Sequence, residues 1–305
     1  MQIGKIQPVI KWSGSKRSQA PEIVRHFPSE IDTYYEPFCG GLSVGITAIL
    51  AKKEGLLNIN RFVFSDTDKN LISLWKWIKI SPDEIIEHYT KRQQLMEEFS
   101  HGDVAKQKEY YHIVRDTFNN YNNSEILLSC SHPGKDETYN PSFDFMFLNR
   151  TYFNGLIRYN SSEEFNTPFH LNRKGIEPDK FEKIVHEWSQ LLNENNTEFV
   201  CCDFENWNPN ENDFVYLDPP YANTKGMYGE AFDNQRMFKW METLKCPYAL
   251  SYNGINGNND NTYDVPQQLY DEKLSILSGN SSFKRLKTEY KHANVYESLY
   301  LKRTK

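Results

Sequence analysis

Four residues that follow a short apolar run have the chemistry to hold an amine. The run Phe214–Leu217 is typical of a buried strand, and Asp218, Pro219, Pro220 and Tyr221 follow it directly. The two prolines remove backbone donors and fix φ, so the chain must leave the sheet here. Asp218 and a rigidly held main-chain carbonyl then offer two acceptors to an exocyclic amine. Tyr221 offers a face for a stacked base, worth about 1–3 kcal/mol. The alternative is a strand ended by prolines with an incidental aspartate, which is common for D-P-P alone.

Two more stretches have the composition of a ligand site. The segment EPFCGGLSVG (residues 36–45) joins a predicted strand to a predicted helix through glycines, which allow a backbone to approach a ligand closely. The next predicted strand ends in Asp66, about 25 residues further on, where an acid can accept hydrogen bonds from ribose hydroxyls. The alternatives are a purely structural turn and, for Asp66, an N-cap. Near the N-terminus, KWSGSK (residues 11–16) places lysine and small residues before a helix, which suits an anionic group or a surface loop.

The stretch NRTYFNGLIRYN (residues 149–160), followed by EFNTPF (residues 164–169), interleaves aromatic residues, asparagines and two arginines around a glycine. Arginine can read guanine, asparagine can read adenine, and an aromatic ring can wedge between base steps. Taken alone, a polar hairpin packed by its own aromatic side chains explains this stretch better.

In this order, the four stretches resemble the Dam family of DNA adenine methyltransferases, and most of all its phage-encoded members. The resemblance runs from Lys11 to the last predicted strand, NVYESLYLK. It implies S-adenosylmethionine as the methyl donor. The donor-site residues that it implies are Trp12, Ser13, Gly14, Lys16, Pro37, Phe38, Gly40, Asp66, Asp203, Phe204 and Asp218.

The resemblance also implies a mechanism in duplex DNA. An adenine must be flipped out of the stack, at a cost of a few kcal/mol. Tyr221 would stack on it, while Asp218 and the Pro219 carbonyl would accept hydrogen bonds from its 6-amino group, with Pro220 holding the turn. These bonds help to localise the nitrogen lone pair, so no strong base is needed before transfer.

The residues implied at the DNA are Lys11, Arg150, Phe153, Asn154, Leu156, Arg158 and Asn160, and the family's common target, GATC, is the first expectation. Two departures from the family pattern stand out. Leu42 replaces the last glycine of F-x-G-x-G, which puts the loop shape in question. HLNRK after Phe169 differs from the usual continuation, so the last base pair of the site is expected to be read differently or loosely.

DPPY-like tetrads also occur in enzymes that methylate cytosine amines, RNA or glutamine side chains. A cytosine-amine or RNA methyltransferase is therefore the rival enzyme, and a DNA-binding homologue that has lost catalysis is the non-enzyme alternative. Asp218 rather than serine favours adenine, and the presence of Lys16 and Asp66 argues against decay. The role in a restriction–modification system, a phage or a housekeeping pathway stays open.

The elements that must position these residues alternate between strand and helix at first, which favours a parallel sheet with helices on both faces. The strand signals vanish between about residues 70 and 195. We therefore expect an α/β protein with a Rossmann-like class I methyltransferase sheet, formed by residues 1–70 and 196–305. Residues 71–195 are expected to be an inserted, mainly helical DNA-recognition domain with a hairpin loop. The predicted strands are 33–36, 61–65, 198–202, 214–217, 248–252, 273–277 and 295–302, and the predicted helices are 16–27, 43–53, 69–79, 82–98, 104–119, 179–193 and 234–243.

Composition fits a globular protein, with 305 residues, 38% of them hydrophobic and 25% charged. The chain lacks a run apolar enough to span a bilayer and begins without a signal-peptide pattern, so we expect no membrane partner. The five cysteines are odd in number and form no C-x-x-C, and the eight histidines lack metal-binding spacing. No metal site is therefore expected, and the expected location is the reducing cytoplasm of a bacterial or phage-infected cell.

The net charge is −6, yet both ends are basic. Residues 1–28 carry five lysines and arginines against one glutamate, and residues 283–305 carry seven against two. Two basic ends on an acidic body can form a local phosphate-binding face, although a solvated surface of mixed sign is the preferred explanation from charge alone. The expected partner is double-stranded DNA, bound by a monomer or weak dimer.

Overall fold

The computed structural model describes residues 3–122, 140–153, 157–162, 164–172, 175–220, 232–256, 259–260, 262, 264–279 and 295–303. The sequence expectations for Tyr221, Asn154 and Leu156 lie outside these residues.

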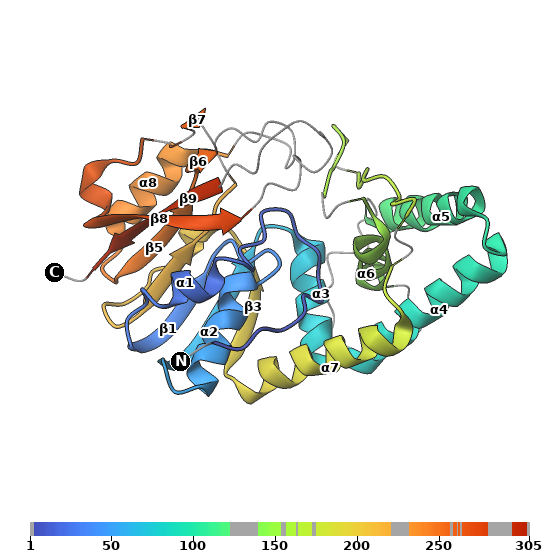
Figure 1. Cartoon of the computed structure of the whole chain (residues 1–305), viewed down its shortest axis with the longest axis horizontal. Helices are drawn as coiled ribbons and strands as arrows, with labels where there is room; N and C mark the ends of the chain where they lie inside the picture. The colour runs from blue at the N-terminus through green and yellow to red at the C-terminus, as the bar shows by residue number, and fades with distance from the viewer. Residues whose placement is uncertain are drawn as a thin grey trace.

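A mixed sheet forms the centre of the fold (Figure 1). In the described part of the chain the strand order is β3-β2-β1-β4-β5-β9-β6-β7. Strand β8 lies off this path and pairs with β9. The neighbours from β3 to β5 are all parallel, and β9 runs antiparallel to β5 and β8. The strands are β1 (Glu30–Glu36), β2 (Asn58–Asp66), β3 (Thr197–Cys201), β4 (Phe214–Leu217), β5 (Tyr248–Tyr252), β6 (Ile255–Asn256), β7 (Asn259–Asp260), β8 (Glu272–Gly279) and β9 (Val295–Lys302). Because the first five strands are parallel, their carboxyl ends meet at one edge.

Helices pack on both faces of this sheet. Along β4, Phe214 and Tyr216 join the apolar cluster that contains α1 and α2, whereas Val215 and Leu217 join the cluster that contains α8. This alternation follows from the two-residue period of a strand. The helices are α1 (Ala20–Val24), α2 (Ser43–Lys53), α3 (Lys69–Ile80), α4 (Pro82–Ser100), α5 (Val104–Asn122), α6 (Pro141–Thr151), α7 (Pro178–Glu194) and α8 (Asn234–Thr243), and short 3₁₀ turns lie at Phe204–Asn206 and Gln267–Leu269.

Two helices differ from the sequence expectation. The helix expected over 16–27 is only α1, because Pro21 belongs in a first turn and Pro28 disfavours helical backbone in the residue before it. Conversely, α6 was not among the helices predicted from the sequence. Its start has a recognisable signal, since the Asn140 side chain accepts a hydrogen bond from Ser142 N at 3.0 Å and Pro141 occupies the first turn.

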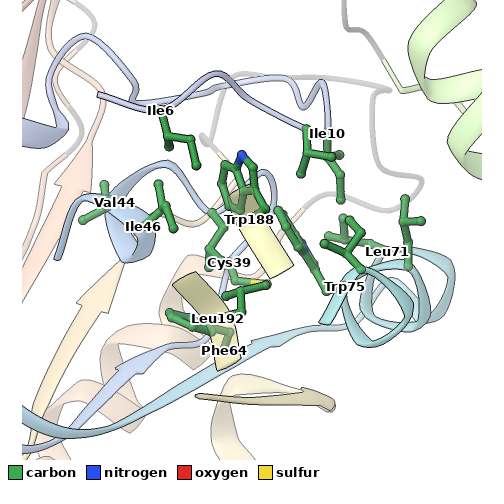
Figure 2. Close-up of a cluster of buried hydrophobic side chains, with 14 of the residues drawn as sticks. Ile6, Ile10, Cys39, Val44, Ile46, Phe64, Leu71, Trp75, Trp188 and Leu192 are labelled. Atoms are coloured by element: carbon green, nitrogen blue, oxygen red, sulfur yellow. The ribbon is translucent and has the colours of Figure 1, made fainter. Parts of the chain in front are cut away.

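One part of the larger apolar cluster lies between the N-terminal segment, the sheet and helices α3 and α7 (Figure 2). The rings of Trp75 and Trp188 are 5.1 Å apart, and Trp75 also stacks on Phe199 at 5.7 Å. Trp188 Nε1 donates to the Gln7 carbonyl at 2.7 Å, which ties the N-terminal segment to α7. Helix α3 packs against β2 and β3, and α7 packs along α3 and α4, while α4, α5 and α6 form a helical block beside the sheet (Figure 1).

Candidate functional site

Asp218, at the end of β4, forms an ion pair with a lysine from the N-terminal loop. Lys16 Nζ lies 2.7 Å from Asp218 Oδ1 and 3.4 Å from Glu297 Oε2 on β9, and the lysine side chain is only 3% exposed. The same ammonium donates to the Gly14 carbonyl at 3.2 Å, beside the half-buried Ser13. The KWSGSK loop, strand β9 and Asp218 thus meet at one buried cation.

The charges of this group set the protonation state of Asp218. Desolvation raises the pKa of Asp218 to about 6, although the Lys16 ammonium works against this rise, and Glu297 adds to it. Burial disfavours the charged form of Lys16, but the two carboxylates outweigh that cost and raise its pKa. Both partners are therefore ionised at neutral pH. Pro219 is buried and Pro220 half-buried, which keeps the chain rigid just beyond the carboxylate.

The glycine turn after β1 meets the acid at the end of β2. Gly40 N donates to Asp66 Oδ2 at 3.2 Å, and Asp68 N donates to Asp66 Oδ1 at 3.1 Å. A Cβ on Gly40 would lie 2.7 Å from Trp12 Cδ1, so only glycine lets this indole approach the turn. Pro37, at the start of the turn, is buried. Desolvation, followed by the charge of Asp68, raises the pKa of Asp66 to about 7.

Leu42, which replaces the family's usual glycine, adopts the left-handed conformation at the start of α2, with φ 57° and ψ 33°. Such a backbone costs a residue with a Cβ on the order of 1 kcal/mol or more. The side chain is fully buried, and this burial offsets the strain. The loop keeps the conformation that a glycine would favour, so the departure at Leu42 leaves the turn intact.

Aromatic rings line the neighbouring strand ends. Phe38, after β1, lies 5.6 Å from Phe204, after β3, and 5.5 Å from Phe232. The Arg236 guanidinium lies 4.8 Å above the Phe204 ring and pairs with Asp203. The Asp203-Phe204 pair is thereby held beside the glycine turn by α8.

The start of the NRTYFNG stretch holds the backbone of Lys11. Lys11 N donates to Asn149 Oδ1 at 2.8 Å, and Asn149 Nδ2 donates back to the Lys11 carbonyl at 2.8 Å. Tyr152 Oη also donates to this carbonyl, and Lys11 Nζ donates to the Arg150 carbonyl at 2.9 Å. Asn149 is fully buried. Sequence reasoning quoted Asn149 but gave it no role, because its partner lies 138 residues away.

Arg150 does not lie where a DNA contact would require it. Its side chain is 7% exposed, and Nη1 donates to the carbonyls of Pro8 and Val9 at 3.1 and 3.3 Å. This placement differs from the sequence expectation because the N-terminal segment covers the end of α6. The guanidinium satisfies carbonyls that would otherwise be buried without a partner.

The residues after α6 form a hairpin (residues 157–162 and 164–169), with an antiparallel bridge between Tyr159 and Phe165. Arg158 is exposed on it, as is Phe153 just before it, whose ring lies 5.2 Å from His170. Asn160, which is expected at the DNA, also shapes this hairpin. Its side chain accepts hydrogen bonds from two backbone N–H groups of the hairpin turn.

The described residues contain no group of histidine, cysteine, aspartate and glutamate side chains arranged to hold a metal ion. None of the helices in the described ranges has the length and apolar character needed to cross a membrane.

Residues 12–278 match the D12 class of N6 adenine-specific DNA methyltransferases. The chain is 33% identical over 226 residues to the type II methyltransferase M.MjaIII of Methanocaldococcus jannaschii, which covers 71% of this chain and 70% of that protein. It is 29% identical over 221 residues to the DNA adenine methylase of Haemophilus influenzae, covering 72% and 65%. It is 31% identical over 238 residues to the type II methyltransferase M.FokI of Planomicrobium okeanokoites, covering 77% of this chain but 31% of that protein.

Proposed function

Because this chain belongs to the D12 class of N6 adenine-specific DNA methyltransferases, we propose that it transfers a methyl group from S-adenosylmethionine to the 6-amino group of a flipped adenine in duplex DNA. The observation that carries the proposal is the 2.7 Å ion pair between Lys16 and Asp218. It keeps a carboxylate charged and immobile at the carboxyl end of β4, beside the loops that follow β1 and β2. The kinship with phage-encoded members stays a prediction.

The residues at the strand ends fit the proposed donor. Asp66 is a half-buried carboxylate next to a glycine turn, and its ionised oxygens suit the hydroxyls of a ribose. Phe38 and Phe204 offer apolar ring surfaces for a purine, with Asp203 beside them. Trp12, Ser13, Gly14 and Lys16 would close the site from the N-terminal loop, and Pro37 and Gly40 would form its floor. When bound, S-adenosylmethionine supplies an electrophilic methyl group on a positively charged sulfur.

In the proposed transfer step, the chain's own residues accept hydrogen bonds from the adenine amine, orient the base and exclude water. The Asp218 carboxylate and the Pro219 carbonyl would accept the two N–H bonds of the amine, which turns its lone pair away from the ring and toward the methyl group. Tyr221 would stack on the adenine, and Pro220 would keep the acceptors rigid. Lys16 stays charged and keeps Asp218 ionised. The proton is lost from the amine after transfer, when the nitrogen has become acidic.

For target choice we propose Lys11, Phe153, Asn154, Leu156 and Arg158 as the DNA-facing residues, with GATC as the sequence. Arg158 and Phe153 are exposed, as this role requires, and Lys11 is held next to α6 by Asn149. We leave Arg150 out of the contact surface because it is buried, and we keep Asn160 as a DNA-facing residue that also shapes the hairpin turn.

We also propose that two parts of the chain have different functions. Residues 1–70 and 196–305 would bind the donor and carry out transfer, and residues 71–195 would recognise the target. Helix α3 would be the connection between the two, because it belongs to the second stretch and yet packs against β2 and β3, and α7 packs along α3.

A product assay separates this function from its rivals. The protein is incubated with S-adenosylmethionine and either unmethylated duplex DNA or RNA, and the nucleosides of each digest are identified by mass spectrometry. We expect N6-methyladenine from the duplex and no modified nucleoside from RNA. N4-methylcytosine or a modified RNA nucleoside would instead identify the chain as the rival, a cytosine-amine or RNA methyltransferase. A protein that binds DNA without binding the donor would be the inactive homologue.

Donor affinity is expected to depend on the protonation of Asp66. Because its pKa is raised to about 7, only the form present above that pH is an acceptor for both hydroxyls. Affinity should therefore rise by about tenfold from pH 6 to pH 8. Asp66→Asn should bind the donor analogue sinefungin at least about tenfold more weakly and lose this pH dependence. Calorimetric titration measures both.

The matched control for that experiment is Asp32→Asn, which alters an exposed aspartate on the neighbouring strand β1. It should keep the wild-type affinity and pH dependence. An unchanged pH dependence in Asp66→Asn would remove Asp66 from the proposed donor site.

A further inference from the structure

The hairpin contacts the start of α3 through the hydroxyl of Tyr159. Tyr159 Oη donates to Asp68 Oδ2 at 2.9 Å. The other oxygen of Asp68 caps α3, because it accepts hydrogen bonds from Asn70 N at 2.9 Å and Leu71 N at 3.0 Å. Asp68 is thus fixed on one side by its own helix and on the other by the segment proposed to face DNA.

The same aspartate is the neighbour of the proposed ribose-binding acid. Asp68 N donates to Asp66 Oδ1 at 3.1 Å, and Asp66 Oδ2 accepts from Gly40 N at 3.2 Å. A continuous path of hydrogen bonds therefore leads from the hairpin, through the turn between β2 and α3, to the glycine turn after β1. The charge of Asp68 also raises the pKa of Asp66, so the two carboxylates are coupled electrostatically.

We propose that Tyr159 is a positioning residue that couples DNA binding to donor binding. When DNA holds the hairpin, Tyr159 holds Asp68, and Asp68 holds Asp66 in the orientation that accepts the ribose hydroxyls. Coupling of this kind is reciprocal, so a bound donor strengthens DNA binding by the same factor. The inference rests on the proposed function, since it requires both ligands.

The structure supplies a matched control in the same hairpin. Tyr111 on α5 donates its hydroxyl to the Thr167 carbonyl at 2.8 Å. This bond anchors the hairpin to the helical block and leads away from the donor site. Tyr159 also contacts Phe165 through its ring, with centroids 6.1 Å apart, and a phenylalanine keeps that contact. Tyr159→Phe and Tyr111→Phe therefore each remove one hydroxyl group that anchors the same hairpin.

The experiment measures the dissociation constant of sinefungin by calorimetry, alone and with a saturating short duplex that carries the sequence the wild-type protein methylates. The ratio of the two constants is the coupling factor, and factors of about 5–150 are typical of coupled sites. We expect a factor of about 5 or more in the wild type and in Tyr111→Phe. We expect a factor near one in Tyr159→Phe, with donor and DNA each still bound.

Three results would overturn the inference. The first is a wild-type coupling factor in Tyr159→Phe, and the second is an equal loss in Tyr111→Phe, which would assign the effect to hairpin stability. The third is a factor of one in the wild type. Failure of the proposed function looks different, because the wild type would then not bind sinefungin at all.

Discussion

Asp218→Ala is expected to abolish methyl transfer, lowering the single-turnover rate by about 10³-fold or more. The carboxylate is the charged acceptor for the amine, and its position is fixed by a 2.7 Å contact with Lys16. Alanine leaves the adenine amine without the acceptor that turns its lone pair toward the methyl group. DNA binding should stay within a few-fold of wild type, because the DNA-facing residues lie on other elements. The rate is measured with enzyme in excess over duplex, and binding by fluorescence polarisation.

Asp179→Ala is the control for that experiment, because it removes an exposed carboxylate from α7. It should leave rate and binding unchanged. Transfer by Asp218→Ala within tenfold of the wild-type rate would contradict the role of Asp218 as the acceptor.

Lys16→Met is expected to reduce the rate at pH 7 by about 100-fold and to move the acid limb of the pH–rate profile upward. In the wild type the limb should lie near the pKa of Asp218, about 6, because the carboxylate must be ionised to accept. The Lys16 ammonium lowers that pKa against desolvation. Without it, Asp218 sits beside Glu297 and takes up a proton at neutral pH. Part of the rate should therefore return above pH 8, where Asp218 ionises again.

The same variant is expected to be less stable, since breaking a buried ion pair costs about 3–5 kcal/mol. Thermal unfolding identifies the temperatures at which it remains folded, and the pH profile is measured there. Lys302→Met, which breaks the ion pair between Lys302 at the end of β9 and Asp271 just before β8, is the control. An acid limb that stays in place in Lys16→Met would show that Lys16 does not control the protonation of Asp218.

The regular elements with a clear period were predictable from sequence. The strands 214–217, 248–252 and 295–302 and the helices 43–53 and 234–243 begin and end where the pattern predicts. Each has a clear apolar run or an apolar face of strand or helix period, bounded by proline, glycine or polar residues, so local chemistry decides its limits. Helix α6 was missed because its aromatic and polar residues resemble a recognition loop, and tertiary packing decides its conformation.

The sequence allowed the residues of the site to be predicted, but not the contacts between them. The resemblance grouped Lys16, Asp66 and Asp218, but not the ion pair, which joins residues about 200 positions apart. Glu297 was not expected as its third member, since the place of β9 beside β5 cannot be read from the order of the strands. The burial of Arg150 was likewise hidden, because the N-terminal segment that covers it lies 141 residues away in sequence. Side-chain partners at such separations depend on the assembled fold.

The most direct test of the central claim is to incubate the protein with S-adenosylmethionine and unmethylated genomic DNA, and to map the modified bases by long-read sequencing. The account predicts N6-methyladenine confined to GATC. Methyladenine in another motif would keep the mechanism and discard the assignment of Lys11, Leu156 and Arg158. The absence of N6-methyladenine from DNA treated with protein that binds the donor would contradict the account.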